Sequence, residues 1–328
     1  MIVGFILAAY SVVANDAIQT LGTFLSSNRD KKWWVLWLFA GAILVATMLY
    51  GWLNYSGDVS YGRLEKIGDL PSPFHWWYVL PPLVLLFVTR LGVPVSTTFL
   101  ILSVFSIAGI DGSTSDVFIS FFDFETKTGQ MLNKSILGYL LAFSLGLGVY
   151  IAITRTIEKR FIQSENDEKQ RQLWTVLQWF ATGFLWCQWL IQDLANIFVY
   201  LPRQLSITEL FLALAMILGL LAYIFKSNGG QIQKIVTSKT NTADIRSATI
   251  IDLIYAIILL YFKQYNKFPM STTWVFVGLL AGREIAMAFM LNSPNKKTMF
   301  KMLAKDLGKV FMGLVVSIIL VLLIHAMQ

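Results

Sequence analysis

Two polar clusters occur twice along this chain, in the same order and at nearly the same spacing. The first copy has Asn15-Asp16 and then Ser96-Thr97-Thr98, and the second has Gln192-Asp193-Leu194-Ala195-Asn196 and then Ser271-Thr272-Thr273. Aspartate and serine are 80 positions apart in the first copy and 78 in the second. Carboxylates inside apolar membrane segments are costly and usually mark the route of an ion or substrate. The arrangement predicts a duplicated transporter whose site is shared between the halves.

The aspartate clusters have the chemistry of a small-cation site. Asn15 precedes Asp16 and Gln19 follows it by one helical turn, so these side chains share a helix face. The second copy reverses the amides, because Gln192 precedes its aspartate and an asparagine follows. Carboxylate and carboxamide oxygens are hard ligands that suit such cations. Hydrogen bonding between membrane helices is the structural alternative.

Each Ser-Thr-Thr triplet has the chemistry of an anion site. Pro94 and Pro269 precede the two serines by two positions, and proline favours the first turn of a helix. We therefore expect both triplets at helix N-termini, where backbone N–H groups, hydroxyls and the positive end of the helix dipole point together. The alternative is that these residues are N-caps that bind only their own backbone.

The composition is that of a multi-pass membrane protein, and we expect it in the cell (inner) membrane. Of 328 residues, 56% are apolar and 14% charged, whereas soluble domains carry about 25% charged residues. The net charge of +7 does not indicate nucleic-acid binding, because no basic patch alternates with aromatic residues. The single cysteine, Cys187, allows neither an intrachain disulfide nor a thiolate metal site. Met1–Leu25 has no cleavage signal and is expected to be a retained span.

Ten apolar segments suggest an all-α membrane protein of about 10 transmembrane or hairpin segments in two repeats. We expect the first repeat at 1–157, a charged cytoplasmic linker at 158–172 and the second repeat at 173–328. The segments fall at about 2–25, 33–53, 76–89, 93–110 and 135–153 in the first repeat, and 173–201, 206–225, 248–262, 268–291 and 310–327 in the second.

The loop charges give the two repeats opposite orientations. Basic residues concentrate at Arg29–Lys32, in the linker, at Lys226–Arg246 and at Lys296–Lys309, while the other long loops are acidic. Placing the basic loops in the cytoplasm makes the segments alternate and leaves the N- and C-termini external. Because each repeat has an odd number of crossings, the repeats are inverted.

Several isolated residues have weaker signals. Arg203 is expected at the membrane interface, with an anion vestibule as the alternative. Asp252 is either a second ion ligand or proton relay, or a partner of Arg246 or a nearby hydroxyl. Arg283-Glu284 is expected to form a structural ion pair. The two histidines, His75 and His325, do not have the spacing of a metal site, and we expect neither to be catalytic.

At these residues the chain resembles the PiT family of inorganic phosphate transporters. That family has a duplicated Asn-Asp-x-Ala-Asn signature and a downstream Pro-x-Ser-Thr-Thr-His signature. Asn15-Asp16 and Gln192–Asn196 are similar to the first, and Pro94–Thr98 and Pro269–Thr273 are similar to the second. The resemblance covers nearly the whole chain.

The resemblance implies a sodium-coupled phosphate symporter with inverted repeats, often a homodimer, and no cofactor other than sodium ions. It implies sodium binding by Asn15, Asp16, Asp193 and Asn196. It implies anion binding by Ser96, Thr97, Thr98, Ser271, Thr272, Thr273, Gln19 and Gln192.

The chain departs from the family pattern at several positions. Gln19 and Gln192 each replace an asparagine, and Phe99 and Trp274 stand where the family has histidine after Ser-Thr-Thr. The Gly-Pro that follows the second Asn-Asp signature is also absent. These changes leave open phosphate against sulfate or a related oxyanion, and sodium against proton coupling. A transporter-like receptor that binds an anion without moving it is an alternative of another class. An intramembrane enzyme is disfavoured, because the chain has only two scattered histidines and one cysteine.

Overall fold

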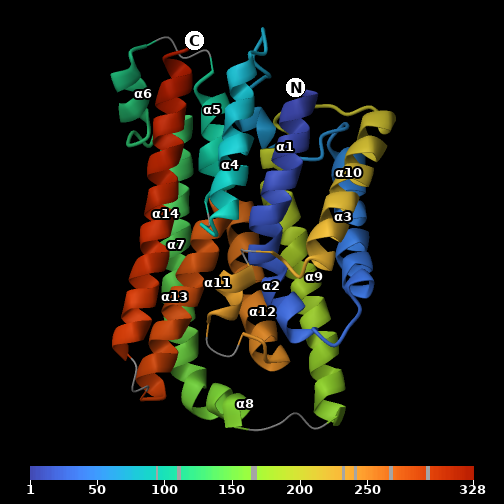
Figure 1. Ribbon diagram of the computed structural model, residues 1–328, viewed down its shortest axis with the longest axis vertical. Coiled ribbons are helices and arrows are strands. Elements are labelled where there is room, and N and C mark those ends of the chain that lie inside the picture. The colour runs from blue at the N-terminus through green and yellow to red at the C-terminus, as the bar shows by residue number, and fades with distance from the viewer. Residues whose placement is uncertain are drawn as a thin grey trace.

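The protein is a bundle of long helices, several of which run from one end of the molecule to the other (Figure 1). This computed structural model describes residues 1–93, 95–108, 112–163, 168–230, 233–239, 242–265, 269–292 and 296–328. Its α-helices are α1 (Ile2–Val12), α2 (Ile18–Ser27), α3 (Trp33–Asn54), α4 (Leu80–Arg90), α5 (Ser103–Ser106), α6 (Thr114–Ser120), α7 (Lys127–Ile153), α8 (Lys159–Gln163), α9 (Glu168–Phe198), α10 (Ile207–Lys226), α11 (Gln233–Thr237), α12 (Ile245–Tyr265), α13 (Thr272–Met290) and α14 (Lys296–His325).

Each of the ten predicted segments corresponds to helical structure, which confirms the all-α membrane fold. Among the described residues, seven helices are long and apolar enough to cross a membrane: Ile2–Ser27, Trp33–Asn54, Lys127–Gln163, Ile207–Lys226, Ile245–Gln264, Thr272–Met290 and Lys296–His325. The shorter apolar helix Trp76–Arg90, the helix at Thr98–Ser106 and α9 also belong to the bundle. The sequence places the start of the last helix too late, because α14 begins at Lys296 within the lysine-rich stretch.

Both chain termini lie at one end of the bundle and α8 lies at the other (Figure 1). The loop charges predict this arrangement, with the termini on one side and the linker on the opposite side. Part of the predicted linker is helical, since α8 ends at Gln163 and α9 begins at Glu168, and residues 164–167 lie outside the described part. The repeat boundaries and the compartments on either side stay predictions.

The helix contacts repeat between the halves. α7, at the end of the first repeat, packs along α13 of the second, and α14, at the end of the second, packs against the helix at Thr98–Ser106 of the first. α1 packs on α4 within the first repeat as α9 packs on α12 within the second, and α3 contacts its counterpart α10 across the two repeats. Each half therefore completes the other around the region where both polar clusters lie.

α7 and α13 pack so closely that only glycine fits at their points of contact. A Cβ at Gly282 would lie 2.1 Å from the carbonyl oxygen of Phe143, and a Cβ at Gly146 would lie 2.5 Å from that of Leu279. Both obstacles are backbone atoms, which a rotamer change cannot move. The two helices therefore pack backbone against backbone, as small residues permit between membrane helices.

We predict that Gly282→Ala destabilises the protein, because the methyl group forces α7 and α13 apart. Overpacking of this kind costs about 3 kcal/mol or more, which lowers Tm by roughly 5 °C. The matched control is Gly148→Ala, a helical glycine with nothing within 4 Å of an added Cβ, which should leave Tm unchanged or slightly raised. Thermal unfolding in detergent measures both, and equal Tm values for the two variants would contradict the packing argument.

Candidate functional site

The first polar cluster lies in a wide turn of the first long helix. Val13–Ala17 forms one π-helical turn between α1 and α2, a feature that occurs frequently at functional sites. Asn15 Nδ2 donates to Asp16 Oδ1 and to the carbonyl oxygen of Val95, both at 2.7 Å. Gln19 Nε2 lies 3.4 Å from the same carboxylate oxygen. The cluster is therefore tied to the backbone just before the first Ser-Thr-Thr triplet.

The second cluster lies near the end of α9, in a regular α-helix. Asn196 Nδ2 donates to Asp193 Oδ1 at 2.8 Å, as Asn15 does to its own aspartate. Gln192 Nε2 donates to the carbonyl oxygen of Leu259 in α12 at 3.1 Å. In both clusters, therefore, one oxygen of the aspartate accepts a hydrogen bond from a neighbouring asparagine.

A single hydroxyl joins the two clusters. Thr97 Oγ1 donates to Asp16 Oδ2 at 2.7 Å and accepts from Asn196 Nδ2, also at 2.7 Å. A continuous chain of hydrogen bonds thus runs from Asp16 through Thr97 and Asn196 to Asp193. The two aspartates, 177 positions apart in the sequence, lie in one site.

The serines of both triplets act as N-caps. Ser96 Oγ accepts from the backbone N–H of Phe99 at 3.3 Å, and Ser271 Oγ accepts from that of Trp274 at 3.2 Å. The expected helix N-termini are therefore present. The serine hydroxyls bind backbone N–H groups of their own helices, which is the N-cap role given above as the alternative. Pro94 lies outside the described residues.

The third residues of the triplets bind across the interface between the halves. Thr98 Oγ1 donates to the carbonyl oxygen of Met270 at 3.0 Å, and Thr273 Oγ1 lies 3.3 Å from that of Val95. Because Met270 and Val95 precede the two serines by one residue, these contacts are equivalent under an exchange of repeats. Such reciprocal bonds place the two helix N-termini face to face.

All twelve residues predicted to bind sodium or anion lie in the interior, each at most 4% exposed. The structure brings them together around the facing helix starts. In the second triplet Thr272 lies beside Asp193, and its carbonyl oxygen accepts from the hydroxyl of Tyr255 at 3.0 Å. The residues are Asn15, Asp16, Gln19, Ser96, Thr97, Thr98, Gln192, Asp193, Asn196, Ser271, Thr272 and Thr273.

Buried oxygens without a hydrogen-bond donor concentrate at this site. Among the described residues they include one carboxylate oxygen and four carboxamide oxygens, and each can only accept a hydrogen bond or bind a cation. Leaving a buried acceptor unpaired costs about 1–3 kcal/mol. The oxygens fit a bound cation or a ligand that donates protons. They are Asn15 Oδ1, Gln19 Oε1, Gln192 Oε1, Asp193 Oδ2 and Asn196 Oδ1.

The two aromatic residues at the family's histidine positions meet each other. The rings of Phe99 and Trp274 are 5.6 Å apart between centroids and inclined at 53°. Phe99 is fully buried. Like the hydrogen bonds of Thr98 and Thr273, this contact joins equivalent positions of the two repeats. It places apolar rings where a histidine would offer a hydrogen-bond donor and a charge.

Asp252 lies apart from the two clusters and is bound to hydroxyls. Its two oxygens accept from Thr23 of α2 and Thr182 of α9, both at 2.5 Å. Of the partners expected from the sequence, a nearby hydroxyl is therefore correct. Arg246 instead binds the carboxylate of Asp244 at 2.7 Å.

Arg203 binds backbone carbonyl groups. Its Nη2 donates to Gly68 at 2.6 Å and its Nη1 to Val199 at 3.2 Å. The guanidinium therefore fixes the loop after α9 to the loop after α3. These contacts do not require an anion vestibule.

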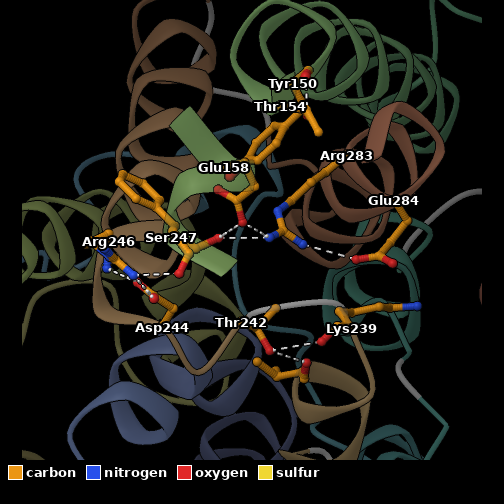
Figure 2. Close-up of polar contacts among 12 residues, drawn as sticks. Tyr150, Thr154, Glu158, Lys239, Thr242, Asp244, Arg246, Ser247, Arg283 and Glu284 are labelled. Atoms are coloured by element: carbon orange, nitrogen blue, oxygen red, sulfur yellow. Dashed lines mark hydrogen bonds and ion pairs between the residues drawn. The ribbon is translucent and has the colours of Figure 1, made fainter. Parts of the chain in front are cut away.

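The predicted pair Arg283-Glu284 belongs to a larger buried network (Figure 2). Arg283 Nη1 lies 3.0 Å from Glu284 Oε1, and Nη2 lies 3.1 Å from Glu158 Oε1. Ser247 Oγ donates to the same oxygen of Glu158 at 2.8 Å. Arg283 and Glu158 are fully buried, so the network joins α13, α12 and the π-helical turn Thr154–Glu158 that follows α7 by charged hydrogen bonds.

The histidines take no part in either cluster. His75 stacks on Trp77, and His325 lies with Nε2 3.1 Å from the carbonyl oxygen of Gly112. Within the described part of the chain, no group of histidine, cysteine and acidic residues has the arrangement of a metal centre.

The sequence does not reveal two buried cations close to the site. Arg63, in the loop after α3, is 2% exposed, and Lys134 of α7 is 3% exposed. The Arg63 Nε donates to the carbonyl oxygen of Ile191 in α9 at 2.8 Å. In the sequence both residues lie in loops or at segment ends, where exposed basic residues are common, so nothing marks them as buried.

Comparison with known proteins supports the fold. The chain matches no family model and no curated protein. A solved structure described as "The sodium-dependent phosphate transporter" aligns with a TM-score of 0.59 over 98% of this chain and 94% of that chain, at 18% identity. The match confirms, for the fold, the resemblance that the motifs indicate.

Proposed function

We propose that the protein is a secondary active transporter that moves inorganic phosphate together with sodium. The observation that carries the proposal is the set of five unpaired buried oxygens around Asp16 and Asp193, beside two facing helix N-termini. The oxygens supply cation ligands and the helix starts supply anion donors within one site. A solved structure of the same fold is described as a sodium-dependent phosphate transporter.

Sodium ions at the two clusters would cancel the charge of the aspartates. A dianion could then bind nearby without facing two bare carboxylates, and the opposite charges together cost less to hold in a low-dielectric interior. The backbone N–H groups at the starts of the two helices, with the hydroxyls of Thr97 and Thr272, are the donors we assign to the anion. In the arrangement described here Thr97 donates to Asp16, so binding requires an exchange of hydrogen-bond partners.

The unpaired acceptors favour phosphate over sulfate. At neutral pH phosphate retains a proton that it can donate, whereas sulfate has none. The carboxamide oxygens of Asn15 and Gln192 are buried without a donor and can accept a hydrogen bond from that proton. A site for sulfate would place those same oxygens against an anion that has only acceptors.

Alternating access is the transport mechanism that this architecture suits. The site is closed to both ends of the bundle, because its residues are at most 4% exposed. The two halves contact each other through reciprocal bonds at the helix starts, and rocking of one repeat against the other would expose the site to each side in turn. The proposal includes a homodimer in the cell (inner) membrane, as the family resemblance implies.

Uptake by proteoliposomes tests the proposal. Radiolabelled phosphate and sulfate are offered separately, with the sodium gradient and the proton gradient imposed one at a time. With an inward sodium gradient, we expect the proteoliposomes to accumulate phosphate to at least ten times the level that they reach when potassium replaces sodium. The same gradient should drive less uptake of sulfate than of phosphate. If only the proton gradient drives accumulation, the coupling ion is the proton and not sodium.

Two other results would contradict the proposal. Preferred accumulation of sulfate would make the protein a permease for that anion. Phosphate binding to the purified protein without any flux, including exchange of labelled for unlabelled phosphate, would make it an anion-binding receptor.

A further inference from the structure

The loop after α3 has a turn that directs the side chain of Arg63 into the interior. The carboxylate of Asp58 accepts from the backbone N–H of Ser60 at 2.6 Å and of Gly62 at 2.8 Å. Between them the chain takes positive φ values at Tyr61 and Gly62, of 59° and 74°. This tight turn folds back under the end of α3, where the Tyr61 hydroxyl donates to the carbonyl oxygen of Thr47 at 2.6 Å.

The guanidinium of Arg63 lies next to the second aspartate cluster. Its Nε donates to the carbonyl oxygen of Ile191 at 2.8 Å, two residues before Asp193 on α9. Its positive charge lies within electrostatic range of the Asp193 carboxylate. Burial lowers the pKa of Arg63 to about 10, so the side chain stays protonated at neutral pH. A second buried cation, Lys134, lies within electrostatic range of Arg63.

A symporter has to return empty after it releases its sodium, and any carboxylate that stays ionised then lacks a mobile counter-ion. Once sodium has left, an ionised carboxylate in the interior is strongly unfavourable, because its charge is no longer compensated. Asp193 already has a positive group that cannot diffuse away. Among the described residues, the hydrogen-bond partners of the Asp16 carboxylate are amides and a hydroxyl, and none of them is a cation.

We propose that Arg63 is a tethered counter-cation of Asp193, which lets the unloaded carrier reorient without sodium at the second cluster. This inference rests on the proposed function and adds a division of labour between the clusters. The Asp16 cluster depends on sodium for neutralisation, and the Asp193 cluster is neutralised in part by the protein itself. Arg63 acts as a positioning residue for charge and is not assigned a contact with the anion.

The inference separates two transport modes. Exchange of external labelled anion for internal unlabelled anion uses only the loaded carrier, whereas net uptake also requires the empty carrier to return. We expect Arg63→Gln to lower net sodium-driven uptake at least tenfold and to leave exchange within threefold of wild type. Arg63→Lys, which keeps the charge, should restore most of the net uptake.

A binding measurement tests the charge without transport. Thermal shift of the purified protein is titrated with sodium chloride against choline chloride at constant ionic strength. Arg63→Gln should bind sodium more tightly than wild type, by roughly tenfold, because a nearby positive charge is gone. A merely structural role would weaken sodium binding. Arg63→Met, which fills the same apolar space, is a second neutral variant if the glutamine variant does not fold.

Arg203→Gln is the matched control. Arg203 is also a partly buried arginine that donates to backbone carbonyl groups at the same end of α9, but the charges that act on it are those of Asp69 and Asp58. It should leave sodium affinity and the ratio of exchange to net uptake at wild-type values. Unchanged or weaker sodium binding in both neutral Arg63 variants, or equal losses of exchange and net uptake, would overturn the inference. Absence of any oxyanion flux in wild type would defeat the proposed function alone, since the sodium titration still reports on Arg63.

Discussion

Replacement of Asp16 or Asp193 by asparagine is expected to abolish the sodium dependence of phosphate uptake. The substitution keeps the size of the side chain and removes the formal negative charge that a sodium ion would neutralise. Hydrogen bonds and contacts that involve a charged group are worth about 1.5–3 kcal/mol, so sodium-driven uptake should fall roughly 10- to 100-fold. Initial rates in proteoliposomes, with sodium replaced by choline on both sides, measure the effect.

Asp252→Asn is the matched control for these two variants. Asp252 is as deeply buried as Asp16, but both of its oxygens accept from threonine hydroxyls and neither is left unpaired. The variant should retain the wild-type ratio of uptake with sodium to uptake with choline. Sodium coupling that survives in both Asp16→Asn and Asp193→Asn would refute the ion role of the clusters.

Thr97→Val should have the second largest effect. Its hydroxyl binds both clusters, at 2.7 Å from Asp16 Oδ2 and 2.7 Å from Asn196 Nδ2. Valine has the same shape and leaves both groups buried without that partner, at about 1–3 kcal/mol each. We expect sodium-driven uptake to fall roughly 30-fold or more, while Thr97→Ser stays within a few-fold of wild type.

A threonine of the same bundle serves as the control for Thr97. Thr249 is buried, but its hydroxyl donates to the carbonyl oxygen of Ile245 within its own helix at 2.7 Å. Thr249→Val should therefore leave uptake near the wild-type rate. Uptake that falls equally in Thr97→Val and Thr249→Val would show that the loss comes from general destabilisation.

The sequence predicts the helices well, because membrane helices depend mainly on the length of their apolar segments. The repeated motifs also predict that the two halves contact each other at the polar clusters. The pairing of Asp16 with Asp193 follows from an inverted duplication, which places equivalent residues around one axis. The N-terminal positions of Ser96 and Ser271 follow from local chain chemistry. These features are determined by short stretches of the sequence.

The remaining features depend on contacts between distant segments. The π-helical turn at Val13–Ala17 has no signal in its residue types, and α9 carries the equivalent cluster in a regular helix. Arg63 is buried because Asp58 shapes its loop, which the basic and acidic residues of that loop do not reveal. The start of α14 lies before the predicted segment because its first turns are lysine-rich, and hydropathy does not detect a helix of that kind.

The most direct test of a shared cation and anion site is the reciprocity of binding. Isothermal titration of the purified protein gives the affinity for phosphate with and without sodium, and the affinity for sodium with and without phosphate. Two ligands that neutralise each other in one site must strengthen each other by the same factor, and we predict a factor of at least ten. Phosphate and sulfate affinities that are both unchanged by sodium would contradict the account.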